Sequence, residues 1–66
     1  MDITKEFKKI MIDEQIFQED IAKELKVTQQ NISAKFQKND YRISELVAIA
    51  NILGYDVKIE FFKKNN

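Results

Sequence analysis

Apolar residues near the start of the chain recur at helical spacing. They occupy positions i, i+4, i+7 and i+8, and the residues concerned are Ile3, Phe7, Ile10 and Met11. Side chains at this spacing form one apolar stripe along a helix. Asp2, directly before the stripe, is a suitable N-cap because its carboxylate can accept a hydrogen bond from a free backbone N–H. The pattern predicts a first helix from Asp2 to about Asp13.

A second, shorter stripe predicts a helix over residues 18–26. Its inward-facing members are Ile21, Ala22 and Leu25. Glu19 and Asp20 lie in the first turn, where the helix dipole favours negative charge.

The sequence VTQQNIS, residues 27–33, predicts the start of a third helix after a tight turn. Thr28 is a good N-cap, and Val27 and Ile32 on either side of it form the apolar pair called a hydrophobic staple. Ile32 and Phe36 continue the buried stripe. The same periodicity turns the opposite side chains outward, and these are Gln30, Ser33, Ala34 and Gln37, with Gln29 exposed in the first turn.

Polar residues over 37–42 predict a loop, after which Ser44 is the expected N-cap of a fourth helix. Its apolar residues follow at i, i+3, i+4 and i+7, and they are Leu46, Ile49, Ala50 and Leu53. Gly54 stands where helices commonly end in a left-handed residue.

The segment YDVKIEFF alternates apolar and polar residues, which predicts a β-strand over residues 57–62. One strand in a helical chain has no edge to pair with, and unpaired buried backbone groups are costly. We therefore expect antiparallel pairing with a second copy across a two-fold axis. The expected dimer interface comprises Val57, Ile59, Phe61 and Phe62. The alternative is a solitary flap laid on the helices of its own chain.

The composition excludes several classes of site. A chain of 66 residues is one domain, here residues 1–66, and it buries only about 60% of the surface that its unfolded form exposes. It has no cysteine and no histidine, so we expect no disulfide, no imidazole or thiolate metal site, no cofactor and no enzymatic activity. A partner subunit is the remaining means of stabilisation. No apolar run approaches the ~20 residues of a membrane helix and no signal peptide is evident, which predicts a cytoplasmic protein.

Two short helices joined by a tight turn, over residues 18–36, form the arrangement called helix-turn-helix. In such units the second helix enters the DNA major groove and its N-terminal side chains meet base edges. Each glutamine or asparagine amide offers a donor beside an acceptor, which matches N6 and N7 of adenine. Between residues 26 and 42 there are four basic side chains and one acidic side chain, although the net charge of the whole chain is zero.

The stretch FQEDIAKELKVTQQNIS resembles the Cro/CI-type (XRE-type) helix-turn-helix repressors of phages and bacteria, and the resemblance extends over about residues 16–54. It implies a mainly α, four-helix domain that binds double-stranded DNA. The residues expected to read bases are Gln29, Gln30, Asn31 and Ala34. Those expected to contact the sugar-phosphate backbone are Gln18, Thr28, Ser33, Lys35, Lys38, Asn39, Tyr41 and Arg42.

The chain departs from that family at three places. Lys26 stands in the turn where glycine is frequent, so a left-handed backbone there costs about 1 kcal/mol. Phe17 stands where a threonine or serine often caps the second helix. Lys35 and Phe36 exchange the usual order of an apolar residue and a glutamate. Independently of the resemblance, Tyr41 suits either a phosphate contact or a place over the core.

The expected function is sequence-specific transcriptional regulation, most simply by a Cro-like repressor that binds a near-palindromic operator as a homodimer. No membrane partner and no small-molecule ligand are expected. The alternative is a protein-binding module, for example an inhibitor or antitoxin-like partner. In that case the contact surface would include the acidic residues Asp13, Glu14, Glu19 and Asp20.

Overall fold

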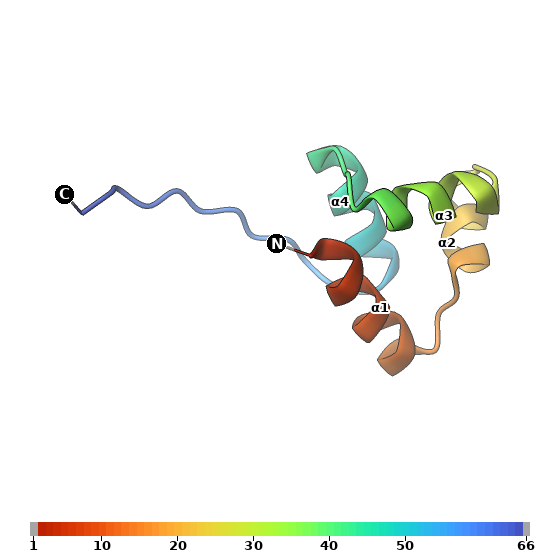
Figure 1. Cartoon of the computed structure of the whole chain (residues 1–66). Coiled ribbons are helices and arrows are strands. Elements are labelled where there is room, and N and C mark those ends of the chain that lie inside the picture. Colours follow the sequence, from red (N-terminus) through yellow and green to blue (C-terminus); the bar gives the residue numbers. More distant parts are fainter. Residues whose placement is uncertain (1, 66) are drawn as a thin grey trace.

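The computed structural model describes residues 2–65, which form a small all-helical domain followed by an extended C-terminal segment (Figure 1). The four helices of the described residues are α1 (Ile3–Glu14), α2 (Gln18–Leu25), α3 (Gln29–Lys38) and α4 (Ile43–Ile52). The mainly α class agrees with the sequence prediction. The bounds of α1 and α2 agree with it to within one residue, and α3 extends two residues into the predicted loop.

Local capping explains where α1 begins and ends. The Asp2 carboxylate accepts a hydrogen bond from the Lys5 N–H at 3.0 Å, which satisfies one of the free donors of the first turn. Gln15, directly after the last helical residue, takes up the left-handed conformation with φ 57° and ends the helix. The chain can then change direction toward α2.

The N-terminus of α2 is capped from inside the helix. Phe17 has no side-chain acceptor, but the Asp20 carboxylate accepts a hydrogen bond from the Phe17 N–H at 2.8 Å. This is the half of a capping box in which the third helical residue reaches back. An acidic residue in the first turn thus replaces the missing threonine or serine.

The turn from α2 to α3 has a left-handed residue despite the absence of glycine. Lys26 has φ 58° and ψ 43°, and the Val27 N–H donates to the Ala22 carbonyl at 3.0 Å. This hydrogen bond is typical of a Schellman motif. Only residues 26–28 separate the two helices, so the geometry is compatible with the predicted helix-turn-helix arrangement.

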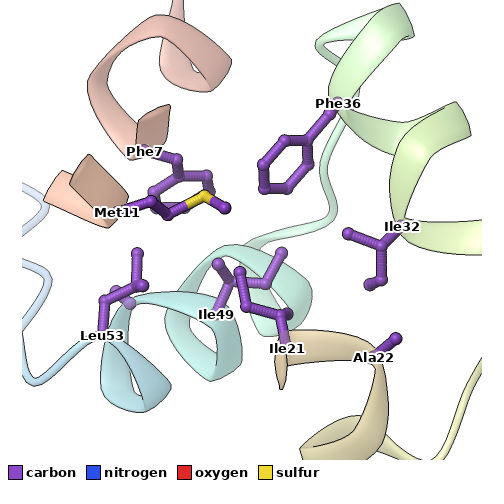
Figure 2. Close-up of a cluster of buried hydrophobic side chains, with 9 residues drawn as sticks. Phe7, Met11, Ile21, Ala22, Ile32, Phe36, Ile49 and Leu53 are labelled. Carbon is purple, nitrogen blue, oxygen red and sulfur yellow. The ribbon is translucent and has the colours of Figure 1, made fainter. Parts of the chain in front are cut away.

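The core lies where all four helices meet, and Figure 2 shows their side chains converging. Each helix supplies at least two buried residues, and Leu53, directly after α4, adds one more. The buried apolar residues are Phe7, Met11, Ile21, Ala22, Ile32, Phe36, Ile49, Ala50 and Leu53. Every one of them belongs to a stripe predicted from the sequence. Leu25 and Leu46, predicted in the same stripes, are partly buried against this cluster.

The start of α4 differs from the prediction. Arg42, rather than Ser44, is the N-cap, and Ser44 is exposed in the first turn. The reason is again a carboxylate that reaches back, because Glu45 Oε1 accepts a hydrogen bond from the Arg42 N–H at 2.8 Å. The predicted end is confirmed, since Gly54 follows the helix with φ 85°.

The predicted β-strand over residues 57–62 is wrong for this chain taken alone. No strand occurs within residues 2–65, and residues 55–65 run as an extended segment that leaves the helical body (Figure 1). A β-strand needs hydrogen bonds to the backbone of a neighbouring strand, and the backbone groups of the helices are already paired within each helix. The alternative flap is not formed either, since Val57 alone in this range packs against the core cluster.

Among the described residues, no helix combines the length and apolar character needed to cross a membrane.

Candidate nucleic-acid interface

Helix α3 begins at a well-formed cap. Thr28 has extended backbone angles and its Oγ1 accepts a hydrogen bond from the Asn31 N–H at 3.1 Å. Such a cap fixes where the first turn starts and stabilises a helix by about 1 kcal/mol. It therefore also determines which side chains of the following turn point outward.

The two faces of α3 differ completely in character. Ile32 and Phe36 on the inner face are almost fully buried. The four residues predicted to read bases are all exposed on the outer side, and these are Gln29, Gln30, Asn31 and Ala34. The predicted outward direction of Ser33 and Gln37 is confirmed as well. A rigidly anchored helix thus presents three amides and a methyl group to solvent.

This surface has the chemistry that base recognition requires. Each amide carries two N–H donors and a carbonyl acceptor, so it can pair with two neighbouring groups of one base edge. Ala34 has no polar atom and can meet a base only through apolar contact, such as with the methyl group of thymine.

One flank of the α3 surface is joined to α2. The Ser33 hydroxyl donates a hydrogen bond to the Gln18 side-chain carbonyl at 2.8 Å. Both residues are among the predicted contacts to the DNA backbone. The bond connects the first residue of α2 to the middle of α3 and leaves the Gln18 NH₂ group available as a donor.

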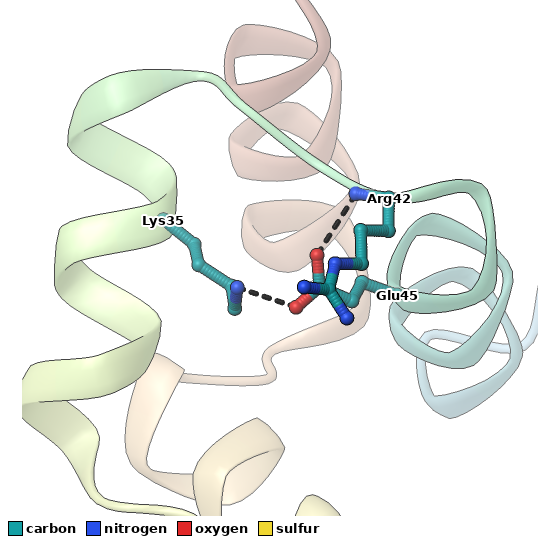
Figure 3. Close-up of polar contacts among 3 residues, drawn as sticks. All are labelled: Lys35, Arg42 and Glu45. Atoms are coloured by element: carbon teal, nitrogen blue, oxygen red, sulfur yellow. Dashed lines mark hydrogen bonds and ion pairs between the residues drawn. The ribbon is translucent and has the colours of Figure 1, made fainter.

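The opposite flank is joined to α4 by an ion pair between Lys35 and Glu45 (Figure 3). Glu45 uses its other oxygen for the Arg42 N–H. The hydrogen bond from Lys35, and next the one from the Arg42 backbone, lower the pKa of Glu45 from its ordinary value. The carboxylate is therefore charged at neutral pH. This pair lies beside an open groove between α3 and α4, also lined by Asn31 and Ser44.

The loop after α3 is fixed to α1 through Thr4. The Thr4 hydroxyl donates to the Phe36 carbonyl at 2.7 Å and lies 2.6 Å from the Tyr41 hydroxyl. Since the single Thr4 proton is used on the carbonyl, Tyr41 is the donor of the second bond. The Thr4 N–H donates to the Asn39 side-chain carbonyl at 3.0 Å.

Tyr41 lies over the core. Its ring packs edge-on against Phe7 at 5.5 Å and Phe36 at 6.2 Å between ring centroids. Burial raises the pKa of its phenol above the ordinary value of 10.0. Of the two alternatives for Tyr41, these contacts favour the structural one. Asn39 likewise has a structural contact, while Lys38 and Arg42 are exposed at either end of the loop.

Thr4 was missed as an organising residue. It is buried, and its position shares a helix face with Phe7 and Met11, three and seven residues further on. A hydroxyl within an apolar stripe is the signal that could have found it, because a buried hydroxyl requires a partner.

The residues of the expected dimer interface are mostly exposed. Phe61 and Phe62 are 96% and 82% exposed, Ile59 is 53% exposed, and Val57 is partly buried. Lys58 and Glu60 form an ion pair along the same segment. Lys58 and Glu60, two positions apart, therefore lie on the same side of the extended segment, as the pattern of alternating residues predicts.

Across residues 2–65 no group of three or more acidic, histidine or cysteine side chains is placed to hold a metal ion. Neither a family model, nor a curated protein, nor a solved structure matches this chain.

Proposed function

We propose that this protein is a sequence-specific DNA-binding regulator, similar to the Cro/CI-type repressors, which acts as a homodimer on a near-palindromic operator. Helix α3 lies in the major groove, where Gln29, Gln30 and Asn31 read base edges and Ala34 makes apolar contact. Thr28, Ser33, Lys38 and Arg42, together with Gln18, face the sugar-phosphate backbone, and Lys35 lies on the flank beside α4, paired with Glu45.

One observation carries the proposal: a short capped helix buries one face and exposes a continuous amide surface on the other. Amides that have no hydrogen-bond partner among residues 2–65 are available to pair with another molecule. Unlike a lysine, an amide gains little from a phosphate and discriminates between bases through its donor and acceptor. A surface made mainly for solubility would carry charges instead.

The dimer supplies the geometry. We propose that residues 57–62 of two copies pair as antiparallel strands, which would cover Phe61 and satisfy the backbone groups of the extended segment. Two α3 helices can enter successive major grooves when they lie about 34 Å apart, so the half-sites should be one helical turn apart. On this proposal, occupancy of the operator follows protein concentration through the dimer equilibrium.

Selection of bound duplexes from random DNA at two salt concentrations tests this function. We expect a palindromic consensus that persists at the higher salt. Weak, uniform recovery of all sequences would contradict sequence-specific binding.

Two substitutions test the division of roles on the selected operator. Gln30→Ala should change the preference at one or two base pairs, with about 1–3 kcal/mol lost at those positions. Lys38→Ala should weaken binding to every sequence alike and reduce the slope of log K against log salt by about 0.9. Equal losses in the two variants, with unchanged preference, would show that the amides do not read bases.

A protein-binding module is the second candidate. Ile12 and Phe17 are exposed and line an apolar hollow together with Lys8, Met11, Gln15 and Ile16. The acidic residues of the alternative, Asp13, Glu14, Glu19 and Asp20, are close in sequence to Ile12 and Phe17. This surface could accept a basic, apolar segment of another protein. Failure of the DNA selection together with saturable binding of such a peptide, abolished by Phe17→Ser, would favour this alternative.

A further inference from the structure

The carboxylate of Glu45 occupies the point at which donors from α3 and α4 converge. Its two oxygens accept from different sources, one from the Lys35 ammonium and one from the Arg42 N–H. The positive charge of the Arg42 guanidinium also stabilises this carboxylate. Figure 3 shows the Arg42 side chain next to Glu45. An ammonium, a guanidinium and a backbone N–H at a helix start are the groups that bind phosphate in proteins.

The Lys35–Glu45 ion pair is partly buried. The Lys35 and Glu45 side chains are only 31% and 26% exposed, so the ammonium is held in the groove between the helices. Lys35 belongs to the α4 flank of the exposed α3 surface, where the DNA backbone would pass. An ammonium neutralised by its own protein releases fewer counterions when DNA binds, and this release is the main source of sequence-independent affinity.

We propose that Glu45 acts as an internal substitute for a DNA phosphate. It occupies Lys35 and thereby removes one phosphate contact from the complex. This inference rests on the proposed function, since it concerns the strength of the same interface. Glu45 is thus a residue that determines affinity without touching DNA: it lowers the electrostatic attraction for every sequence and leaves a larger share of the binding to the amides of α3.

The variant Glu45→Gln isolates the charge. Glutamine can still accept the hydrogen bond from the Arg42 N–H, because both glutamate and glutamine serve at this position of a capping box. The matched control is Glu24→Gln, which makes the same change in charge. Glu24 is exposed on α2 and lines a separate hollow with Ile16 and Ile52.

Binding of each variant to the selected operator and to an unrelated duplex should be measured between about 50 and 200 mM salt. We expect Glu45→Gln to bind both duplexes roughly threefold to tenfold more tightly and to steepen the slope of log K against log salt by about 0.9, as one added phosphate contact would. Glu24→Gln should resemble the wild type. The gain should disappear in the double variant Lys35→Met with Glu45→Gln.

Equal behaviour of the Glu45 and Glu24 variants would overturn the inference, as would weaker binding by Glu45→Gln or a gain that persists without Lys35. Thermal unfolding of each variant establishes that it is folded before binding is compared. A wild-type protein that selects no operator would overturn the proposed function and this inference together. A wild type with an operator, but no effect at position 45, would overturn the role of Glu45 alone.

Discussion

Helix α3 and the C-terminal segment 57–62 both have a regular pattern of apolar and polar residues, but they differ in whether the apolar side chains are buried. In α3 the apolar residues Ile32 and Phe36 are buried by the other three helices. In the C-terminal segment Phe61 remains almost entirely exposed. The helical periodicity of α3 predicted its helix correctly, whereas the two-fold periodicity of residues 57–62 predicted a β-strand that the described residues do not form.

The difference lies in where the backbone hydrogen bonds are made. A helix forms them within itself, so a single chain suffices to fold it. An extended segment needs a neighbouring strand, and this chain offers none among its described residues. The exposed apolar residues of the extended segment are therefore the basis of the proposed dimer, and the exposed amides of the packed helix α3 are the basis of the proposed DNA contact.

The largest expected effect is a difference in the free energy of unfolding between variants of the helical core and variants of the C-terminal segment. Ile49→Ala should lower the free energy of unfolding by about 2–5 kcal/mol because it leaves a cavity among four helices. Phe61→Ala, at a concentration where the protein is monomeric, should change it by less than about 0.5 kcal/mol. Urea unfolding measures both, with Ile49→Val as a milder variant. Comparable losses at the two positions would mean that the C-terminal segment folds onto its own chain.

A smaller effect is expected on self-association. Phe61→Ser should weaken dimerisation by about tenfold or more, since burying a phenylalanine side chain contributes about 1.5–3 kcal/mol. Ile12→Ser, at another exposed apolar residue, is the control and should dimerise like the wild type. Sedimentation equilibrium measures both. A larger loss for the Ile12 variant would move the interface to the α1 surface.

The smallest effect concerns the loop beside α3. The folded protein holds the Tyr41 proton to higher pH than the unfolded chain does, because burial raises the pKa of the phenol. Above about pH 10 the unfolded state therefore binds fewer protons, and the free energy of unfolding should fall as pH rises through the folded pKa. Tyr41→Phe should remove this part of the pH dependence, whereas Tyr55→Phe should retain it. If both variants follow the wild type, the phenol of Tyr41 is not protected by the core.

Much of the fold could be predicted because its determinants are close in sequence. Asp2 and Thr28 are side-chain caps, and their helices begin where predicted. The start of α4 was missed by two residues because its cap is made by Glu45, from inside the helix. At Lys26 the packing of α2 against α3 outweighs the cost of a left-handed lysine.

Some features of the candidate site could also be predicted from the sequence, and others could not. Exposure of Gln30 followed from the periodicity, and exposure of Gln29 followed from its place in the first turn. The contacts that hold the flanks of α3 could not be predicted, because Ser33 meets Gln18 fifteen positions away and Lys35 meets a residue of the next helix. Such pairs depend on how the helices cross. Residues 57–62 pair with no strand within the described part of the chain, so the proposed pairing with a second copy depends on contacts that the periodicity of one chain cannot specify.

The proposed role of α3 is tested most directly by following its side-chain amides during binding. Their NH₂ resonances can be assigned by NMR and titrated with the selected operator, with the exposed Gln15 at the end of α1 as an internal reference. We expect the resonances of Gln29, Gln30 and Asn31 to shift with the operator far more than with an unrelated duplex, while that of Gln15 stays in place. Saturation with operator that leaves these three amides unshifted would contradict base reading by α3.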